Sequence, residues 1–268
     1  MLKNTSNKIR LSLLESLYYA GSGHPGGSLS CVDILTMLYF KIANISKENL
    51  TDENRDRVIL SKGHAAPALY AIFVEKEFIL KEELHKLRHT KALLEGHPTL
   101  KIPGVEAVSG PLGIGFSQGL GMALGAKLQN MPFRTFVVLG DGECNEGQIW
   151  EGAMFATYHK LDNFVAIVDY NKLQSDDFCE NITSLEPLSN KWESFGWNVI
   201  EVNGHNFLDL EEAFDRALKI KGKATVIIAH TIKGKGISFM ENNPLWHGSR
   251  APNNEELKQI ENELGGLL

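Results

Sequence analysis

Short apolar runs alternate with longer amphipathic stretches along most of the chain. The apolar runs have the length of buried strands and lie at residues 56–61, 134–139, 164–168, 197–202 and 224–229. Apolar residues three and four positions apart predict helices at residues 31–43, 65–74, 77–90, 146–160, 188–195, 209–219 and 254–264, after a first helix that ends before Gly21. Because strands alternate with helices, we predict one doubly wound α/β domain over residues 1–268, with a mostly parallel sheet, helices on both faces and a tail helix near residues 254–264.

The strongest sign of a functional site lies between residues 139 and 174. Two predicted strands flank a helix there, and one face of that helix contains Ile149, Trp150, Ala153, Met154 and Tyr158. Such a βαβ unit has parallel strands and a right-handed crossover. Asp141 follows the first strand and Asn171 follows the second, so both are expected at the carboxyl edge of the sheet, where open α/β sheets bind ligands. Neighbouring strands lie about 5 Å apart, so both side chains can reach one point.

The chemistry of these side chains indicates a metal ion. One carboxylate and one amide oxygen form an oxygen-only site of low charge, which suits an Mg²⁺ ion that also binds substrate phosphates. Gly140 and Gly142 let backbone N–H groups approach those phosphates. The alternative is that Gly-Asp-Gly is only a tight turn, but a turn does not explain Asn171 at the equivalent point of the next strand. The joint pattern therefore predicts a metal and diphosphate site.

Several histidines lie in glycine-rich turns instead of on apolar helix faces. His24 is surrounded by three glycines, and we expect an exposed, tight backbone there, followed by a helix that Ser30 caps. The alternative for His24 is a turn histidine in solvent. His64 follows a predicted strand, and His97 repeats the Gly-His-Pro pattern. These turns would present the imidazoles at the edge of the sheet where ligands bind.

Residues 109–125 are rich in glycine without forming a dinucleotide fingerprint. That fingerprint requires a glycine where Gln118 stands, and it requires a clear strand immediately before it. We predict instead a loop at a helix N-terminus that can cradle an anion or a planar ring. Gly121 and Gly125 would permit close packing of the helix that follows. Residues 175–187 are expected to form a polar loop, and residues 236–248 a mobile segment.

Composition and charge exclude several classes of protein. The chain has 27 basic and 33 acidic residues, a net charge of −6, and no basic patch that would indicate nucleic-acid binding. No apolar run approaches the roughly 18 residues of a membrane span, and charges within the first 20 residues argue against a signal peptide. Cys31, Cys144 and Cys179 lack metal-ligand spacing. We therefore expect a cytoplasmic protein in which Cys144 is a packed residue and not a nucleophile.

Eight motifs together resemble, in the same order, the first, diphosphate-binding part of transketolase. They are SGHPGGSLS, DRVILSKGHAAPALYA, GHPT, GPLGIGFSQGLGMALG, GDGECNEGQIWEG, DYNKLQ, TIKGKG and WHG. The resemblance covers the whole chain and implies thiamine diphosphate with Mg²⁺ or Ca²⁺. It implies transfer of a two-carbon ketol unit from a ketose phosphate to an aldose phosphate, with the cofactor as electron sink. Histidines that titrate near neutrality suit the proton transfers on sugar hydroxyls.

The resemblance also implies roles for individual residues. The implied metal ligands are Asp141, Asn171 and the carbonyl of Leu173. The implied cofactor contacts are His64, Gly142 and His247 at the diphosphate, and Gly110 and Leu112 at the pyrimidine side. The implied residues of the substrate channel, which we take as catalytic, are His24, His97 and His247. Glu146 resembles the family's acidic residue that links subunits near the site.

Complete transketolases have two further domains, and the second domain of such an enzyme supplies a glutamate to the cofactor's aminopyrimidine ring. The resemblance therefore implies a C-terminal partner subunit with the pyrimidine-binding domain, and a heterotetramer with two copies of each chain. Residues 175–177 lack a glycine that often follows this motif in the family, and Thr99 stands where many relatives have an acidic residue. Because of these departures, the sequence does not identify the donor and acceptor sugar phosphates.

There are three alternatives to a transketolase subunit. The first is another thiamine diphosphate enzyme, such as a deoxyxylulose-phosphate synthase or the alpha subunit of a 2-oxo acid dehydrogenase, which would share Gly-Asp-Gly but not SGHPGGS with SKGHAAPALYA. The second is a cofactor-binding partner without catalysis, which the retained histidines disfavour. The third is a dinucleotide dehydrogenase, which fails at Gln118.

Overall fold

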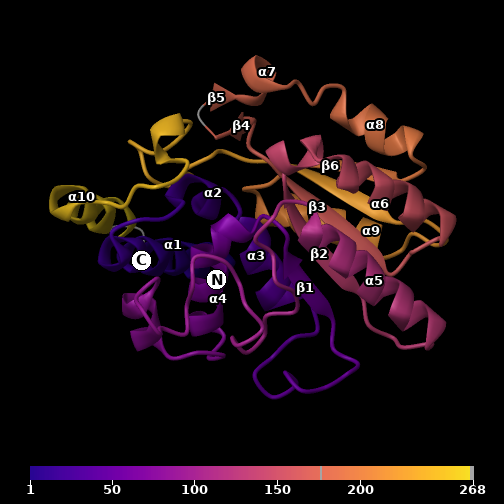
Figure 1. The fold of residues 1–268 in the computed structure, drawn as a ribbon, viewed down its shortest axis with the longest axis horizontal. Coiled ribbons are helices and arrows are strands. Elements are labelled where there is room, and N and C mark those ends of the chain that lie inside the picture. Colours follow the sequence, from indigo (N-terminus) through magenta and orange to yellow (C-terminus); the bar gives the residue numbers. More distant parts are fainter. Residues whose placement is uncertain (176, 266–268) are drawn as a thin grey trace.

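The computed structural model describes residues 1–175 and 177–265 and contains a five-stranded parallel sheet (Figure 1). The order of strands is β1-β2-β3-β7-β6, and each neighbouring pair is parallel. The strands are β1 (Arg57–Leu60), β2 (Thr135–Gly140), β3 (Phe164–Tyr170), β7 (Thr225–His230) and β6 (Asn198–Asn203). All five predicted strands, the βαβ unit and the mostly parallel sheet are therefore confirmed. That the chain forms a single domain stays a prediction.

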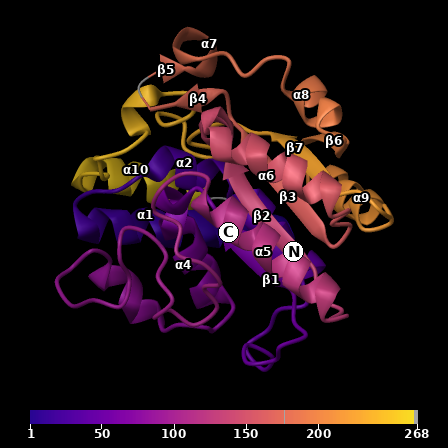
Figure 2. The ribbon, with the colours of Figure 1, turned by 45° about the vertical axis from the view of Figure 1, so that its right-hand side comes forward.

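Helices cover both faces of the sheet, as expected for a doubly wound fold (Figure 2). One face packs against α1 (Leu2–Ala20), α3 (Val32–Met37), α4 (Ala66–Glu75) and α9 (Phe207–Ala217). The other face packs against α5 (Ile114–Leu128), α6 (Gly147–Tyr158) and α8 (Leu188–Ser194). Alternate residues of β2 point to opposite cores, with Phe136 and Val138 in the first and Val137 and Leu139 in the second. Because both faces of the inner strands β2, β3 and β7 are buried, these strands are nearly continuous apolar runs, whereas the edge strand β6 contains the exposed Glu201.

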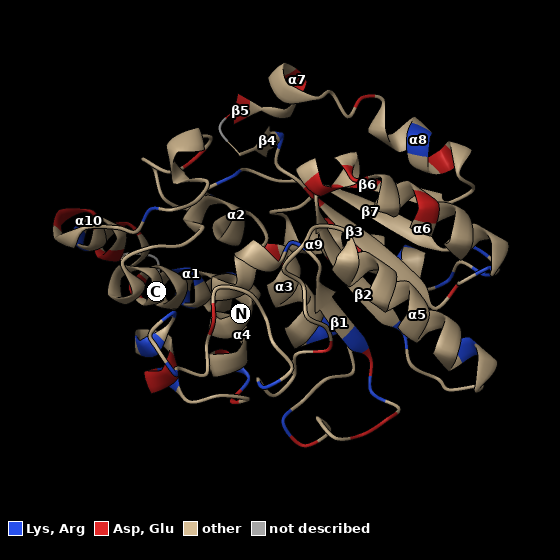
Figure 3. Ribbon diagram, viewed as in Figure 1, with Lys and Arg blue, Asp and Glu red and all other residues tan. Residues whose placement is uncertain are grey.

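The remaining elements are short, apart from the C-terminal helix α10 (Asn254–Gly265), which confirms the predicted tail helix. They are α2 (Pro25–Ser30), β4 (Leu173–Gln174), β5 (Asp177–Phe178), α7 (Cys179–Ile182), the π-helix η1 (Leu38–Ile42), and the 3₁₀ turns η2 (Gly63–Ala65), η3 (Lys81–Lys86), η4 (Gly142–Asn145) and η5 (Pro244–Trp246). Charges of both signs intermix along the loop before β1 (Figure 3). Within the described residues, no helix is long and apolar enough to cross a membrane.

The segment around His24 differs from its prediction. Pro25 begins helix α2, and both Gly26 and Gly27 are buried inside that helix instead of forming an exposed turn. A Cβ atom at Gly26 would lie 2.8 Å from the carbonyl oxygen of Trp246, so this glycine permits a close approach of two backbones. Ser30 belongs to α2 and does not cap the next helix; its hydroxyl donates to Asp169 at 2.5 Å. The predicted helix 31–43 is a short α-helix that continues as a π-helix.

The predicted helix at residues 77–90 is wrong. The segment has only the 3₁₀ helix η3, and Glu77 and Arg88 adopt left-handed backbone conformations at its two ends. Leu84 and Leu87 are buried there, whereas His85 and His89 are exposed, as expected. Two buried leucines do not form the apolar stripe that would hold a helix against the core.

The predicted polar loop at residues 175–187 and the predicted mobile segment at residues 236–248 also contain structure. The first includes β5, which pairs with β4 in antiparallel fashion, and helix α7; its residue 176 lies outside the described residues. The segment at 236–248 includes η5 and buries Ile237, Met240 and Trp246 against the core, so its apolar residues anchor it. A few buried apolar residues that lack helical or strand periodicity are hard to recognise in a sequence.

Helices α5 and α6 pack differently from the predicted pattern. Met154 and Tyr158 are 54% and 81% exposed, and the buried face of α6 consists instead of Ile149, Gly152, Ala153 and Ala156. A Cβ atom at Gly152 would lie 2.6 Å from the Phe116 ring. Gly121 and Gly125 do not mediate close packing within the chain, since a Cβ atom at either position meets nothing within 4 Å. The close approaches of α5 to the sheet are made by Gly115 and Gly119, whose Cβ atoms would lie 2.7 Å from Ser61 and 2.5 Å from Val137.

Candidate functional site

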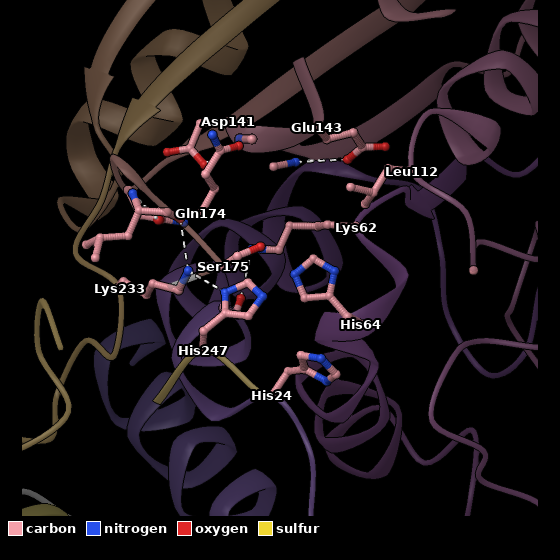
Figure 4. A pocket seen from close by; sticks show the side chains of 16 residues that line it. His24, Lys62, His64, Leu112, Asp141, Glu143, Gln174, Ser175, Lys233 and His247 are labelled. Atoms are coloured by element: carbon pink, nitrogen blue, oxygen red, sulfur yellow. Dashed lines mark hydrogen bonds between the residues drawn. The ribbon is translucent and has the colours of Figure 1, made fainter. Parts of the chain in front are cut away.

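A cavity of about 210 Å³ lies at the carboxyl edge of the sheet, where β1, β2 and β3 end (Figure 4). Its walls come from several separate parts of the chain, because parallel strands bring the loops that follow them to one edge. Nine of the predicted site residues line it, namely His24, His64, Gly110, Leu112, Asp141, Gly142, Asn171, Leu173 and His247. The sequence motifs therefore converge in space as the sheet topology requires.

Asp141 is buried and held in one orientation by the backbone. One carboxylate oxygen accepts a hydrogen bond from the Gly142 N–H at 2.7 Å, and the other accepts from the Lys172 N–H at 2.5 Å. Burial and the negative charge of Asp169 raise the pKa of Asp141 to about 6, against the opposite effect of the two N–H groups. The two N–H groups therefore do not fully compensate the negative charge of the ionised carboxylate, and a bound cation would stabilise it.

Asn171 and Leu173 present two neutral oxygens beside this carboxylate. Asn171 Oδ1 accepts from the Leu173 N–H at 3.1 Å, and the Asn171 amide donates to Asp169. The Leu173 carbonyl accepts a hydrogen bond from the Lys233 ammonium at 2.9 Å. This oxygen thus already faces a positive charge, which fits its predicted role as a metal ligand.

The donor set is compatible with Mg²⁺ or Ca²⁺. Both ions prefer oxygen ligands, and Mg²⁺ in particular uses few protein ligands together with substrate phosphates. Within the described parts of the chain, no group of three or more His, Cys, Asp and Glu side chains could hold a metal ion. A metal at Asp141 would therefore need the amide and carbonyl oxygens, and further ligands from a bound molecule.

Three imidazoles lie next to one another in the wall of the cavity, apart from Asp141 and Glu143 (Figure 4). The ring centres of His24, His64 and His247 are 5.3 to 5.8 Å apart. Burial, followed by neighbouring positive charges, lowers the pKa of His24 to about 4 and that of His247 to about 3, and holds the pKa of His64 well below its usual value. The expectation of histidines that titrate near neutrality is therefore wrong for the ligand-free chain. A bound diphosphate would raise these pKa values, because its negative charge favours the imidazolium.

Two predicted site residues lie outside the cavity wall. His97 is exposed, and its charge contributes to the lowered pKa of His24, so the two side chains lie in the same neighbourhood. Glu146 is also exposed and precedes helix α6. Their roles in substrate binding and in linking subunits stay predictions. Cys144 is fully buried beside the site, and burial raises the pKa of its thiol, which agrees with a packed residue that is no nucleophile.

Sequence patterns gave no role to several residues that shape the cavity. Lys62 is buried at the end of β1, forms an ion pair with Asp169 on β3, and donates to the Gly27 carbonyl at 2.8 Å. Glu143 is buried as well and accepts from the N–H groups of Gly113 and Gly140. It therefore ties the glycine-rich loop that contains Gly110 and Leu112 to the Gly-Asp-Gly turn. The other lining residues without a predicted role are Gly27, Gln174, Ser175 and Lys233.

Lys233 connects the metal-site oxygens with the histidines. Its ammonium bonds the Leu173 carbonyl and lies 2.7 Å from His247 Nδ1. Burial lowers its pKa to about 8, although Asp141 acts in the opposite direction. The motif TIKGKG pointed to this segment, but only the fold shows which of its lysines enters the cavity.

Known proteins are similar to this chain over nearly its whole length. A family described as "Transketolase, thiamine diphosphate binding domain" matches residues 2–266. The chain is 43% identical over 246 residues to one subunit of an apulose-4-phosphate transketolase from Phocaeicola vulgatus, and 42% identical over 241 residues to one subunit of a 6-deoxy-6-sulfo-D-fructose transketolase from a Clostridium species. These matches cover 92% and 90% of this chain and 88% of each relative.

In longer transketolases, this chain matches only one part of the protein. Human transketolase is 39% identical over 94% of this chain, which spans 40% of the human protein. The crystal structure of transketolase from Campylobacter jejuni superposes with a TM-score of 0.93 at 32% identity, and the match covers 98% of this chain and 42% of that one. The chain therefore belongs to the transketolase family, as the thiamine diphosphate-binding part of such an enzyme.

Proposed function

We propose that this chain is the N-terminal subunit of a split transketolase. In that role it binds thiamine diphosphate and a divalent metal ion, and it acts together with a C-terminal partner that supplies the pyrimidine-binding domain. The observation that carries the proposal is the convergence of Asp141, Asn171 and Leu173 with three histidines at one cavity, in a chain whose relatives of similar length are transketolase subunits by name.

The cavity offers matching groups for each part of the cofactor. Asp141, Asn171 and the Leu173 carbonyl would hold Mg²⁺ or Ca²⁺. His64, Gly142 and His247 would contact the diphosphate. Gly110 and Leu112 lie on the loop that Glu143 fixes, where they would face the pyrimidine side. A Cβ atom at Gly142 would lie 2.6 Å from Gln174 Oε1 and 2.8 Å from Gln174 Cβ, so a larger residue at position 142 would clash with Gln174 in the cavity wall.

The chain's own residues position the substrate and move protons. Thiamine diphosphate, when bound, supplies the electron sink for breaking and forming the carbon–carbon bond. His24 and His247 line the cavity and His97 lies in the neighbourhood of His24, so these imidazoles can donate to and accept from sugar hydroxyls. The low pKa values in the ligand-free chain mean that the rings are neutral until a negatively charged ligand arrives. Ligand binding would thereby prepare them to hold a proton.

The surface of α5 and α6 supports assembly with other chains. Leu128, Met154 and Tyr158 are 72%, 54% and 81% exposed. Gly121 and Gly125 leave open space where another backbone could approach closely. We infer that this face is covered in a heterotetramer with two copies of each subunit, in which Glu146 links subunits near the site. The three buried cysteines suit the cytoplasm as its location.

A coupled assay tests the proposal. The purified chain, the purified partner and their mixture are supplied with thiamine diphosphate and Mg²⁺, with xylulose 5-phosphate as donor and ribose 5-phosphate as acceptor. The panel also includes other ketose phosphates, since the names of the relatives include apulose 4-phosphate and 6-deoxy-6-sulfo-D-fructose. We expect ketol transfer only from the mixture. Full activity from the single chain would contradict the split enzyme, and cofactor binding by the mixture without transfer of any sugar would favour a non-catalytic binding partner.

A further inference from the structure

We propose that Arg10, Asp33 and His205 form a buried clamp that positions residues 232–235, and with them Lys233, for the cofactor diphosphate and its metal ion. The inference rests on the proposed function for its ligand. The clamp itself is a feature of the ligand-free chain, and nothing in the sequence motifs points to His205.

The clamp joins three parts of the chain around one carboxylate. Asp33 on α3 accepts a hydrogen bond from the Arg10 guanidinium of α1 at 2.6 Å. His205 Nδ1, in the loop between β6 and α9, lies 2.8 Å from the same carboxylate oxygen. Arg10 and Asp33 are each 4% exposed, so solvent does not screen this ion pair.

The remaining ring nitrogen of His205 and the Nε group of Arg10 bind the backbone on both sides of Lys233. His205 Nε2 accepts a hydrogen bond from the Ile232 N–H at 2.8 Å, and the Arg10 Nε group donates to the Lys235 carbonyl at 3.1 Å. Gly236 follows with a left-handed backbone, and a Cβ atom there would lie 3.0 Å from the Arg10 side chain. The segment is therefore fixed at residues 232 and 235, with Lys233 between them.

The hydrogen bonds also define the state of His205. Because Nε2 accepts from a backbone N–H, it has no proton, so the proton of the neutral ring is on Nδ1 and is donated to Asp33. Asp33 thus selects the tautomer that can hold Ile232. This is the arrangement by which a carboxylate orients a histidine in many catalytic and metal sites.

The position of Lys233 makes this orientation relevant to binding. Its side chain reaches the Leu173 carbonyl and His247 from a segment that belongs to no helix or strand. A buried ammonium at a metal and diphosphate site has to be placed within a fraction of an ångström, because small displacements of positioning groups weaken binding and catalysis strongly. His205 and Asp33 are accordingly positioning residues that act through Lys233.

Two substitutions at one position separate positioning from general stability. His205→Gln can place an amide oxygen near the position of Nε2 and so accept from Ile232. His205→Asn reaches only the position of Nδ1, so it keeps the contact with Asp33 and loses the one with Ile232. The matched control is Asp56→Asn, which removes a buried carboxylate that is 3% exposed and pairs with Arg134 at the opposite edge of the sheet.

Two measurements are made on each variant. The first is amide hydrogen exchange of the peptide that contains residues 231–236, in the full chain without cofactor. The second is the Kd for thiamine diphosphate with Mg²⁺ in the enzyme assembled with its partner, by calorimetry. For His205→Asn we expect faster exchange at Ile232 and a Kd raised about tenfold. For His205→Gln we expect both values to return most of the way to those of the unaltered protein, and for Asp56→Asn no change in either.

The outcomes distinguish the clamp from the proposed function. Equal effects of His205→Asn and His205→Gln, or an equal rise in exchange in Asp56→Asn, would overturn the clamp. Faster exchange at Ile232 with an unchanged Kd would overturn its role in cofactor binding. If the unaltered assembly binds no thiamine diphosphate, the proposed function fails, while exchange at Ile232 still decides whether the clamp holds the segment.

Discussion

Two buried carboxylates at opposite edges of the sheet, Asp56 and Asp141, differ in how their negative charge is compensated. At the amino edge, Asp56 accepts hydrogen bonds from the backbone N–H groups of Asn44 and Arg134 and pairs with the Arg134 guanidinium at 2.6 Å. At the carboxyl edge, Asp141 is equally buried and also accepts two backbone N–H groups. Among the described residues, however, it forms no ion pair within 4.0 Å, and its pKa is raised to about 6.

This difference separates a charged side chain that is compensated within the chain from side chains whose charged forms need a bound ligand for compensation. Asp56 has its counter-charge within the chain, so it fixes the start of β1 whatever is bound. The charged forms of Asp141 and Lys233 are both disfavoured in the ligand-free chain, because burial raises the pKa of one and lowers that of the other. A metal ion and a diphosphate would compensate both. Perturbed pKa values of this kind concentrate at functional sites.

The largest expected effect compares the two aspartates directly. Asp141→Asn should weaken metal-dependent binding of thiamine diphosphate in the assembled enzyme by about 1,000-fold, or about 4 kcal/mol, because it removes the charged metal ligand. The free energy of unfolding of the ligand-free chain should change by less than about 1 kcal/mol, since relief of a buried charge offsets one lost hydrogen bond. Calorimetry and urea denaturation measure the two quantities.

Asp56→Asn should show the reverse pattern, with a loss of about 1 kcal/mol in stability and an unchanged Kd. If Asp141→Asn bound the cofactor normally with metal present, the site assignment would be wrong.

The second effect concerns the internal ion pair of the carboxyl edge. Lys62→Met leaves Asp169 buried without its cation and should lower the free energy of unfolding by about 3 kcal/mol. Lys47→Met removes an exposed pair with Glu77 and should cost less than about 1 kcal/mol. Urea denaturation of the ligand-free chain compares them, and similar losses in both variants would show that the Lys62–Asp169 pair is not a structural one.

The third effect tests the histidines. His24→Ala and His97→Ala should each lower kcat by about 100-fold, equivalent to about 2.7 kcal/mol, while the Kd for thiamine diphosphate stays nearly the same. His89→Ala, at an exposed histidine away from the cavity, should change neither value. Loss of cofactor binding with normal turnover at saturation would mean that His24 and His97 hold the cofactor and do not transfer protons.

The smallest expected effect is the pH dependence of the contribution that Asp33 makes to the free energy of unfolding. Burial raises the pKa of this carboxyl, but the hydrogen bond from His205 and the charge of Arg10 outweigh it and lower the pKa from 3.8 to about 2. A carboxyl with a lowered pKa in the folded state stabilises the fold above its unfolded pKa and loses that contribution as pH falls. Asp33 should therefore contribute about 2 kcal/mol at neutral pH, and the contribution should disappear between about pH 4 and pH 2.

Urea denaturation of the unaltered chain and of Asp33→Asn from about pH 6 downward checks this. The difference in stability should shrink across that window. A difference that stays constant with pH would show that ionisation of Asp33 does not stabilise the fold.

Local patterns were sufficient to predict the strands and to place Asp141 and Asn171 at one edge of the sheet. The apolar runs of β2 and β3 are continuous because both faces of a parallel sheet are buried, and the placement of Asp141 and Asn171 follows from strand ends that share one edge. The prediction of a helix at residues 77–90 was wrong because a helix with many charged residues still needs an apolar stripe that packs against the core. His24 was recognised from its glycines, but its helical and buried surroundings were not.

What the sequence by itself determined is the order of elements, the edge of the sheet at which the candidate site lies and the kinship with transketolase, because each depends on neighbouring residues or on motifs in register. Only the tertiary structure decided that Lys62 pairs with Asp169, which is 107 positions away, and that His205 holds the segment of Lys233. It also decided the direction in which burial shifts the pKa values of the cavity histidines. Ion pairs and pKa values depend on burial and on distances between side chains from separate loops, and neither quantity has a period or a spacing along the chain.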